Sequence, residues 1–160
     1  MKTSLNQSGA IFIELAISLP ILLFLMLAAL DFSKAISEYK TLVNQAKSAA
    51  RYLTSRAPGS ASNEGICIVK TSSTDCSTAL VLANLASASI TIQDAASSAS
   101  THAAQLTSAS SSYAVSINLI SVTISDYRYD SIMGGFSLAG YSIPASINFN
   151  PISVTMRQVN

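Results

Sequence analysis

A single glutamate lies in the most apolar segment of this chain. Residues 10–30 form a run of apolar and small residues in which Glu14 is the only charged side chain, and Gly9 immediately precedes the run. About 20 apolar residues are enough for a helix to cross a bilayer. A charged side chain near the middle of such a helix costs roughly 2.5–3.5 kcal/mol, so a lone carboxylate there usually has a function. Glu14 is therefore the first candidate functional residue.

The second group of residues that could do chemistry is a pair of cysteines. Cys67 and Cys76 lie close together in a segment with turn-forming neighbours. An even number of cysteines in an exported domain favours a disulfide, which here would close a small loop. A zinc site would need more ligands than these two cysteines and His102 offer locally. We expect a disulfide, and no metal or other cofactor.

The remaining polar residues do not form a catalytic pattern. His102 lies in a Ser/Ala stretch, and the sequence has no Gly-x-Ser-x-Gly elbow, paired cysteine nucleophile or glycine-rich phosphate loop. Asp126 and Asp130 flank Tyr127-Arg128-Tyr129 at turn-like spacing, which is typical of solvated charges at strand ends. We therefore expect that the protein is not an enzyme.

Charge composition argues against a nucleic-acid partner. The chain has 160 residues, a net charge of +1 and only 11% charged residues, well below the roughly 25% of ordinary soluble domains. An electrostatic nucleic-acid binder would show a clustered basic face. Much of the polar surface after Pro58 must instead come from Ser, Thr and Asn.

The elements that position these residues begin with one long helix. After the apolar residues 10–30, the pattern over residues 31–57 becomes amphipathic, and Pro58-Gly59 ends it. The apolar stripe consists of Phe32, Ala35, Ile36, Tyr39, Leu42, Val43, Ala46, Ala49, Ala50 and Leu53, and charged residues that include Lys34 and Glu38 face water. The whole helix would be a rod roughly 70 Å long. We expect a kink near Pro20, which lacks one backbone hydrogen bond.

Residues 58–160 are expected to form one small Ser/Ala-rich α+β domain. Residues 60–75 read as a loop, residues 78–88 as a short helix, and residues 95–112 as either a weak helix or a mobile segment. Strand-like alternation covers residues 113–124 and 141–156. In the first strand it changes parity at Leu119-Ile120, which indicates a β-bulge or a change of buried face.

The two strands are expected to pair as an antiparallel C-terminal β-hairpin within a sheet of three or four strands. One face of this sheet would cover the second half of the rod. The predicted fold class is therefore α+β: a long N-terminal helix, half membrane-spanning and half amphipathic, packed on a small antiparallel sheet.

Three other interpretations of the apolar run remain open. A cleaved secretory signal would have an apolar core of about 7–15 residues and an A-x-A-like site, which this run fits poorly. A plain membrane anchor would let Glu14 extend toward the headgroups. A buried helix of a soluble protein would need a similarly apolar partner segment, and none follows.

The chain resembles the TadE-like family of the tight adherence (Tad) pilus systems. The stronger stretch is residues 9–23, GAIFIELAISLPILL, which is similar to the family's glycine, apolar residues, glutamate and Leu-Pro followed by leucines. Weaker similarity is carried by Asp31-Phe32, by residues 49–52 (AARY), by residues 120–124 (ISVTI), by residues 127–129 (YRY) and by residues 154–157 (VTMR).

The resemblance implies a minor pilin or pseudopilin that helps to initiate or build a pilus. It implies that a prepilin peptidase cuts between Gly9 and Ala10, removing a leader of residues 1–9, and that Glu14 then helps the subunit enter the filament. The expected partners are this peptidase, other pilin subunits and inner-membrane lipid. The alternative is an uncleaved single-pass membrane assembly factor of the same apparatus, and a minor pseudopilin of a type II secretion system is a further one.

The orientation of the protein in the membrane is predicted from the residues that follow the apolar run. Counting basic residues beside the span would place the C-terminal side in the cytoplasm. Long domains cross largely regardless of charge, however, and a disulfide needs an oxidising compartment. We therefore expect an inner-membrane protein with its N-terminus inside and its C-terminal domain in the periplasm or outside the cell.

Overall fold

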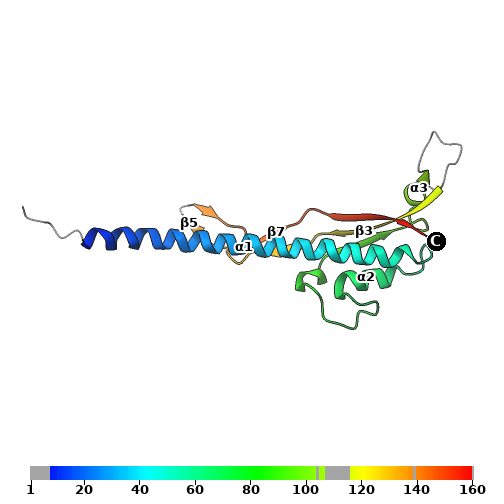
Figure 1. Cartoon of the computed structure of the whole chain (residues 1–160), viewed down its shortest axis with the longest axis horizontal. Coiled ribbons are helices and arrows are strands. Elements are labelled where there is room, and N and C mark those ends of the chain that lie inside the picture. The colour runs from blue at the N-terminus through cyan, green and yellow to red at the C-terminus, as the bar shows by residue number, and fades with distance from the viewer. Residues whose placement is uncertain (1–7, 104, 107–115, 139, 160) are drawn as a thin grey trace, which may run out of the picture.

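The protein is a long helix with a small α+β domain packed along its second half (Figure 1). The structure is a computed structural model that describes residues 8–103, 105–106, 116–138 and 140–159. The predicted fold class is confirmed. The predicted leader, residues 1–9, falls mostly on residues 1–7, which lie outside the described residues.

The helix α1 extends from Ser8 to Thr54 (47 residues). It continues through Pro20, so the missing backbone hydrogen bond there does not end it, and Figure 1 shows one continuous rod without the expected kink. It ends three residues before the predicted end. The hydroxyl of Thr54 donates to the carbonyl of Arg51 (2.7 Å), and side chains that bond to the backbone in this way compete with helical bonds.

A second helix corrects the sequence prediction of a loop over residues 60–75. Helix α2 comprises Ser62–Thr71, and its buried residues include Gly65, Ile68 and Val69 at helical spacing. The Ser, Thr and Gly content of the segment obscured this short stripe. A Cβ atom at Gly65 would lie 2.7 Å from side-chain atoms of both Leu53 and Ile92, so the glycine allows α2 to approach α1 closely.

The short helix predicted over residues 78–88 is also wrong in extent. Only Ala83–Ala86 are helical, as the 3₁₀ turn η1. Leu85 is fully buried, whereas Leu80 is 40% exposed, so one leucine anchors the turn and the others do not form a buried face. In the stretch 95–112 the structure describes one short helix, α3 (Ala99–His102), and β2 (Gln105–Leu106); residues 104 and 107–112 lie outside the described residues.

The main sheet has four antiparallel strands centred on β3 (Ser116–Ser125). On one edge β3 pairs with β8 (Ile152–Gln158). On the other edge it pairs with β1 (Ser89–Gln93) and β2, which lie beside successive parts of β3. This confirms the predicted sheet and the pairing of its first and last long strands.

The change of parity in β3 does not come from a bulge at Leu119-Ile120, and from Ile120 onward one face of the strand is buried. Within the described part of β3 the pairing with β8 runs from Asn118 to Ile124 without a bulge. Ile120, Val122 and Ile124 are at most 1% exposed and belong to the core against α1. The predicted beginning of this strand, Tyr113 and Val115, lies outside the described residues.

The second predicted strand is divided into shorter pieces, so β3 and β8 are not joined by a tight turn. Between them lie two small antiparallel ribbons, β4 with β7 and β5 with β6. Their bounds are Arg128–Asp130 for β4, Ser137–Leu138 for β5, Tyr141–Ser142 for β6 and Ser146–Asn148 for β7. The turn-forming Gly and Pro residues of this region interrupt the alternation.

The core lies between the second half of α1, α2 and the sheet. Its contributions from α1 are Leu42, Ala46, Ala49, Ala50 and Leu53. Three alanines on this face let the sheet and α2 approach the helix backbone. The predicted stripe is therefore correct from Leu42 onward, but Phe32, Ile36 and Tyr39 are 69%, 39% and 47% exposed.

Candidate functional site

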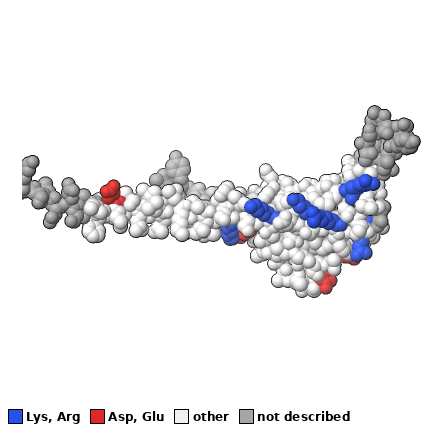
Figure 2. Space-filling view, in the orientation of Figure 1, with Lys and Arg blue, Asp and Glu red and all other residues white. Residues whose placement is uncertain are grey.

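The first half of α1 projects beyond the main sheet of the domain (Figure 1). Most of its large apolar side chains are between 37% and 74% exposed, from Ile11 to Leu30. Figure 2 shows this half almost free of charged residues, whereas basic side chains gather over the domain. Among the described residues, α1 is the one helix that is long and apolar enough to cross a membrane. We call residues 11–30 the apolar half of α1.

Gly9, Ala10 and Glu14 all lie in the first turns of α1. Glu14 is exposed, and a Cβ atom added at Gly9 would meet nothing within 4 Å. Four residues of helix separate Ala10 from Glu14, which is about 6 Å along the axis. The structure therefore leaves the carboxylate free for a partner outside the chain's own domain.

A polar junction marks the end of the apolar half. Asp31 accepts hydrogen bonds from the hydroxyls of Tyr129 and Ser131 (2.5 Å for Ser131) and from the backbone N–H of Ile132 (3.0 Å). Tyr129 also contacts the carbonyl oxygen of Asp31 (3.0 Å). These bonds tie the domain to α1 at the level where the apolar half ends.

The junction keeps Asp31 ionised. Partial burial by itself raises the pKa of Asp31, but the hydrogen bonds from Ser131, Tyr129 and the backbone of Ile132 and Met133 outweigh it, so the pKa lies below its usual 3.8. The opposite holds for Tyr129, whose pKa is raised by burial first and then by its bond to the Asp31 carboxylate. The pair therefore remains a neutral phenol donating to a carboxylate at physiological pH.

An aromatic cluster lies next to this junction and shares Tyr129 with it. Phe149 packs against Tyr129 in a stacked arrangement (6.0 Å between centroids), against Tyr127 (5.5 Å) and edge-on against Tyr39 (5.9 Å). The Tyr127 hydroxyl donates to Glu38 (2.7 Å). Glu38 is thus half-buried and bonded, and the prediction that it faces water is wrong.

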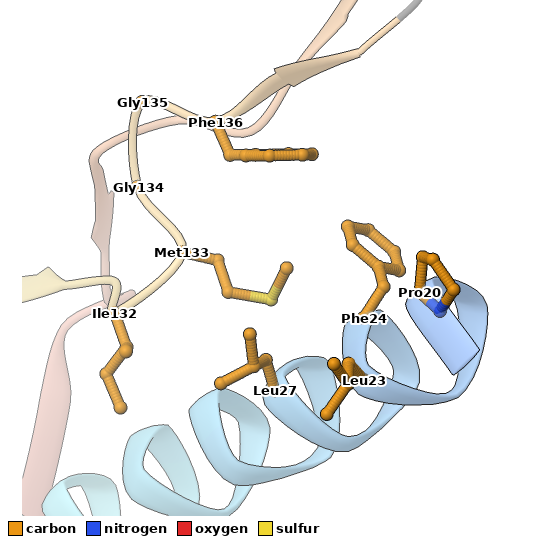
Figure 3. Close-up of a pocket in the computed structure, with 9 residues that line it drawn as sticks. All are labelled: Pro20, Leu23, Phe24, Leu27, Ile132, Met133, Gly134, Gly135 and Phe136. Carbon is orange, nitrogen blue, oxygen red and sulfur yellow. The ribbon is translucent and has the colours of Figure 1, made fainter. Parts of the chain in front are cut away.

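A ribbon of the domain lies beside the apolar half of α1. The aromatic rings of Phe24 and Phe136 are 5.9 Å apart. Figure 3 shows Met133 and Phe136 pointing toward Phe24 and Leu27 across an open groove. The volume of this groove is about 580 Å³. We call residues 131–138 and 140–143, which include β5 and β6, the apolar ribbon.

The disulfide takes no part in this junction. Cys67 and Cys76 are joined, with their Cα atoms 4.8 Å apart, so the bond connects α2 to the loop that follows it. Within that loop the Asp75 carboxylate accepts bonds from the hydroxyls of Ser73 and Ser77 and from the backbone of Ser77, which lower its pKa to about 2. The bond and this network hold the shape of an otherwise irregular segment.

The other polar candidates have structural partners. His102 is 8% exposed, and its Nε2 lies 2.9 Å from the hydroxyl of Ser121 on β3. Asp126 and Asp130 are exposed and separate from His102 in the fold, and Asp130 accepts a bond from Asn84 (3.0 Å). Among the described residues no group of three His, Cys, Asp or Glu side chains is placed to hold a metal ion.

Sequence reasoning missed the junction around Asp31. Its components were visible as separate patterns, Asp31 at the end of the apolar run and the tyrosines of residues 127–129, but nothing in the sequence brought them together. Their contact depends on β4 lying beside α1, which follows from the path of the chain through the sheet.

Comparison with known proteins supports the N-terminal resemblance. A family model described as TadE-like protein matches residues 9–51. This confirms the resemblance over the part of the helix that contains Gly9 and Glu14. No curated protein and no solved structure matches the chain. A TadE-like segment on an exposed apolar helix fits a membrane protein associated with a Tad pilus.

Proposed function

Because residues 9–51 are TadE-like, we propose that the protein is a minor pilin or pseudopilin of a Tad-type pilus. It is inserted in the inner membrane, processed by a prepilin peptidase, and helps to initiate or build the pilus. The observation that carries the proposal is the exposed apolar half of α1, which has one carboxylate, Glu14, close to its N-terminal end.

The proposed assembly step uses that carboxylate. Cleavage after Gly9 gives Ala10 a new amino group, about 6 Å along the axis from Glu14. In a dry bundle, such an amine and the carboxylate of a neighbouring subunit attract strongly, by about 4 kcal/mol at 4 Å and an effective dielectric constant of about 20. Pairing of this kind sets the axial stagger between subunits, and packing of apolar helices offsets their extraction from lipid.

Exposed apolar residues beyond the junction favour a subunit over a simple anchor. Phe32 is 69% exposed and Ile36 is 39% exposed, although both follow Asp31. An anchor needs no apolar side chains on the part of a helix that has left the bilayer core. A helix that packs against other helices over more than its membrane-spanning length does use them.

The proposed location follows from the disulfide and the domain. The disulfide between Cys67 and Cys76 is typical of an oxidising compartment, so we place the domain in the periplasm or outside the cell. The N-terminus then faces the cytoplasm, and the partners are the peptidase, inner-membrane lipid and the helices of other pilins.

The test is the intact mass of the protein purified from membranes, with and without the co-resident prepilin peptidase. Loss of residues 1–9 only when the peptidase is present would support the proposal. A full-length chain in both preparations would contradict it and favour the uncleaved assembly factor. A Gly9→Leu variant, which blocks the proposed cut, is the matched control.

A further inference from the structure

The apolar ribbon has the composition of a membrane-contacting element. No Asp, Glu, Lys or Arg occurs between Asp130 and Arg157. Two of its large apolar side chains are open to their surroundings: Ile132 is 56% exposed and Phe136 is 46% exposed. Together with the exposed side chains of the apolar half they form one larger apolar patch, and such patches mark protein or membrane contact sites.

The ribbon also extends past the polar junction toward the N-terminal end of α1. Ser131 and Ile132 bond to Asp31, and Phe136 packs against Phe24, which precedes Asp31 by seven residues. Seven residues of helix correspond to about 10 Å. The ribbon therefore descends along α1 from the end of the apolar half toward its middle, in the direction of Glu14 (Figures 1 and 3).

The groove between the ribbon and α1 is lined mainly by apolar side chains. Its floor consists of Pro20, Leu23, Phe24 and Leu27, and its wall of residues 132–136. Figure 3 shows the side chains of Met133 and Phe136 turned toward the helix rather than away from it. The floor is continuous with the exposed surface of the apolar half, so whatever surrounds that half also reaches the groove.

Six consecutive backbone N–H groups of the ribbon have acceptors within the protein. Consecutive N–H groups from Ser131 to Phe136 all have acceptors: Ala145 for Ser131, the Asp31 carboxylate for Ile132 and Met133, Ser131 for Gly134, Ile143 for Gly135, and Met133 for Phe136. These intramolecular bonds lower the cost of placing this part of the ribbon in lipid, where each unsatisfied backbone group costs several kcal/mol.

From these observations we propose that the apolar ribbon enters the leaflet on the domain side of the membrane, and that lipid acyl chains fill the groove between residues 132–136 and α1. The ribbon is then a second membrane contact beside the helix. It fixes how deep α1 sits and keeps the domain against the bilayer until the subunit leaves it. This rests on the proposed function only in requiring that α1 spans a membrane.

The absence of tryptophan from the chain makes a direct test practical. Single-tryptophan variants of the full-length protein are reconstituted in phosphatidylcholine vesicles and quenched with brominated lipids or with aqueous acrylamide. Phe136→Trp reports on the ribbon. Leu22→Trp, 65% exposed on the apolar half, is the control for the span, and Val159→Trp, 76% exposed near Thr54, is the control for water.

We expect brominated lipid to quench Phe136→Trp to at least half the extent of Leu22→Trp, and to leave Val159→Trp unchanged. Quenching of Phe136→Trp by acrylamide alone, with Leu22→Trp still quenched by lipid, would overturn the proposal and leave the span intact. Shielding of Phe136→Trp from both quenchers would also overturn it, because protein rather than lipid would then fill the groove. Failure of lipid to quench Leu22→Trp would overturn the span and the ribbon together.

Discussion

Asp31 and Tyr129 are hydrogen-bonded although 98 residues separate them in the sequence. Asp31 belongs to α1 at the end of its apolar half, and Tyr129 is the central residue of β4, 1% exposed. The bond therefore fixes the position of the domain along the axis of α1, relative to the part of the helix that we place in the membrane. Lys34, whose Nζ lies 5.4 Å from the centroid of the Tyr129 ring, adds a second attraction at the same level.

Removing the Tyr129 hydroxyl should weaken this attachment. Phe retains the stacking on Phe149 but leaves the Asp31 carboxylate without one donor, and a hydrogen bond to a charged group contributes about 1.5–3 kcal/mol. We expect Tyr129→Phe to lower the free energy of unfolding by about 1.5 kcal/mol, measured as thermal unfolding in detergent. Tyr39→Phe, at a residue that is 47% exposed, is the matched control and should have little effect.

The same junction should make stability depend on pH in acid. The folded state holds the pKa of Asp31 below its usual 3.8, so the charged carboxylate stabilises the fold above that pH, and the stabilisation is lost as pH falls below 3.8 through the folded pKa. We expect the wild type to be more stable than Asp31→Asn at pH 6, with a difference that shrinks below about pH 4. A constant difference down to pH 2 would contradict this, and Asp126→Asn, at an exposed carboxylate, serves as the control.

The sequence predicted the long elements well because their patterns are periodic and extend over many residues. The alternation around Ile120, Val122 and Ile124 indicated a strand, and the spacing of Leu42, Ala46 and Ala49 indicated the buried face of a helix. In each case one face meets the core over several turns or residue pairs, so the pattern is repeated often enough to be read.

Short elements were missed because their signals are brief or depend on contacts made elsewhere. Helix α2 has only a few buried positions, and Gly65, normally unfavourable in a helix, is accepted because Leu53 and Ile92 leave no room for a side chain. Phe32 and Ile36 continue the helical stripe but stay exposed, although β4 reaches Asp31 beside them. Periodicity shows that a face is apolar, and it does not show what covers that face.

The disulfide should stabilise the α2 region in particular. Closing a loop of about ten residues lowers the entropy of the unfolded chain by an amount worth about 2–3 kcal/mol at 25 °C. We expect the Cys67→Ser/Cys76→Ser double variant to unfold at lower temperature by a corresponding amount, and reduction of the wild type to reproduce the loss. Reduction should have no effect on the double variant, and a drop there would show that the reductant acts elsewhere.

The apolar ribbon should be sensitive to its tightest backbone contact. A Cβ atom at Gly134 would lie 2.5 Å from the Cα and 2.8 Å from the carbonyl oxygen of Ala145, and neither can rotate away. We expect Gly134→Ala to cost about 1–3 kcal/mol and to move the ribbon off α1. In the Phe136→Trp background, lipid quenching should then fall, whereas Ser142→Ala, at an exposed residue of β6, should leave it unchanged.

Substitution of Glu14 should separate the requirements of membrane insertion from those of pilus assembly. Insertion depends on the apolar residues around it, and neutralising a charge in the span makes insertion easier. Assembly depends on the carboxylate if it pairs with the new amino group of a neighbouring subunit. Glu14→Ala and Glu14→Gln should therefore enter the membrane normally while incorporation into pili falls at least tenfold, measured by immunoblotting sheared pili against the membrane fraction.

The matched control for this series is Glu64→Gln, which neutralises a carboxylate on α2, away from the apolar half of α1. It should leave incorporation unchanged. Glu14→Asp keeps the charge but has a shorter side chain, so a pairing mechanism predicts a partial loss of incorporation. If residue 14 had a purely steric role, Glu14→Gln would instead be the variant whose incorporation is closest to that of the wild type. Normal incorporation of Glu14→Ala would remove the basis for the assembly step and would favour a fixed membrane component.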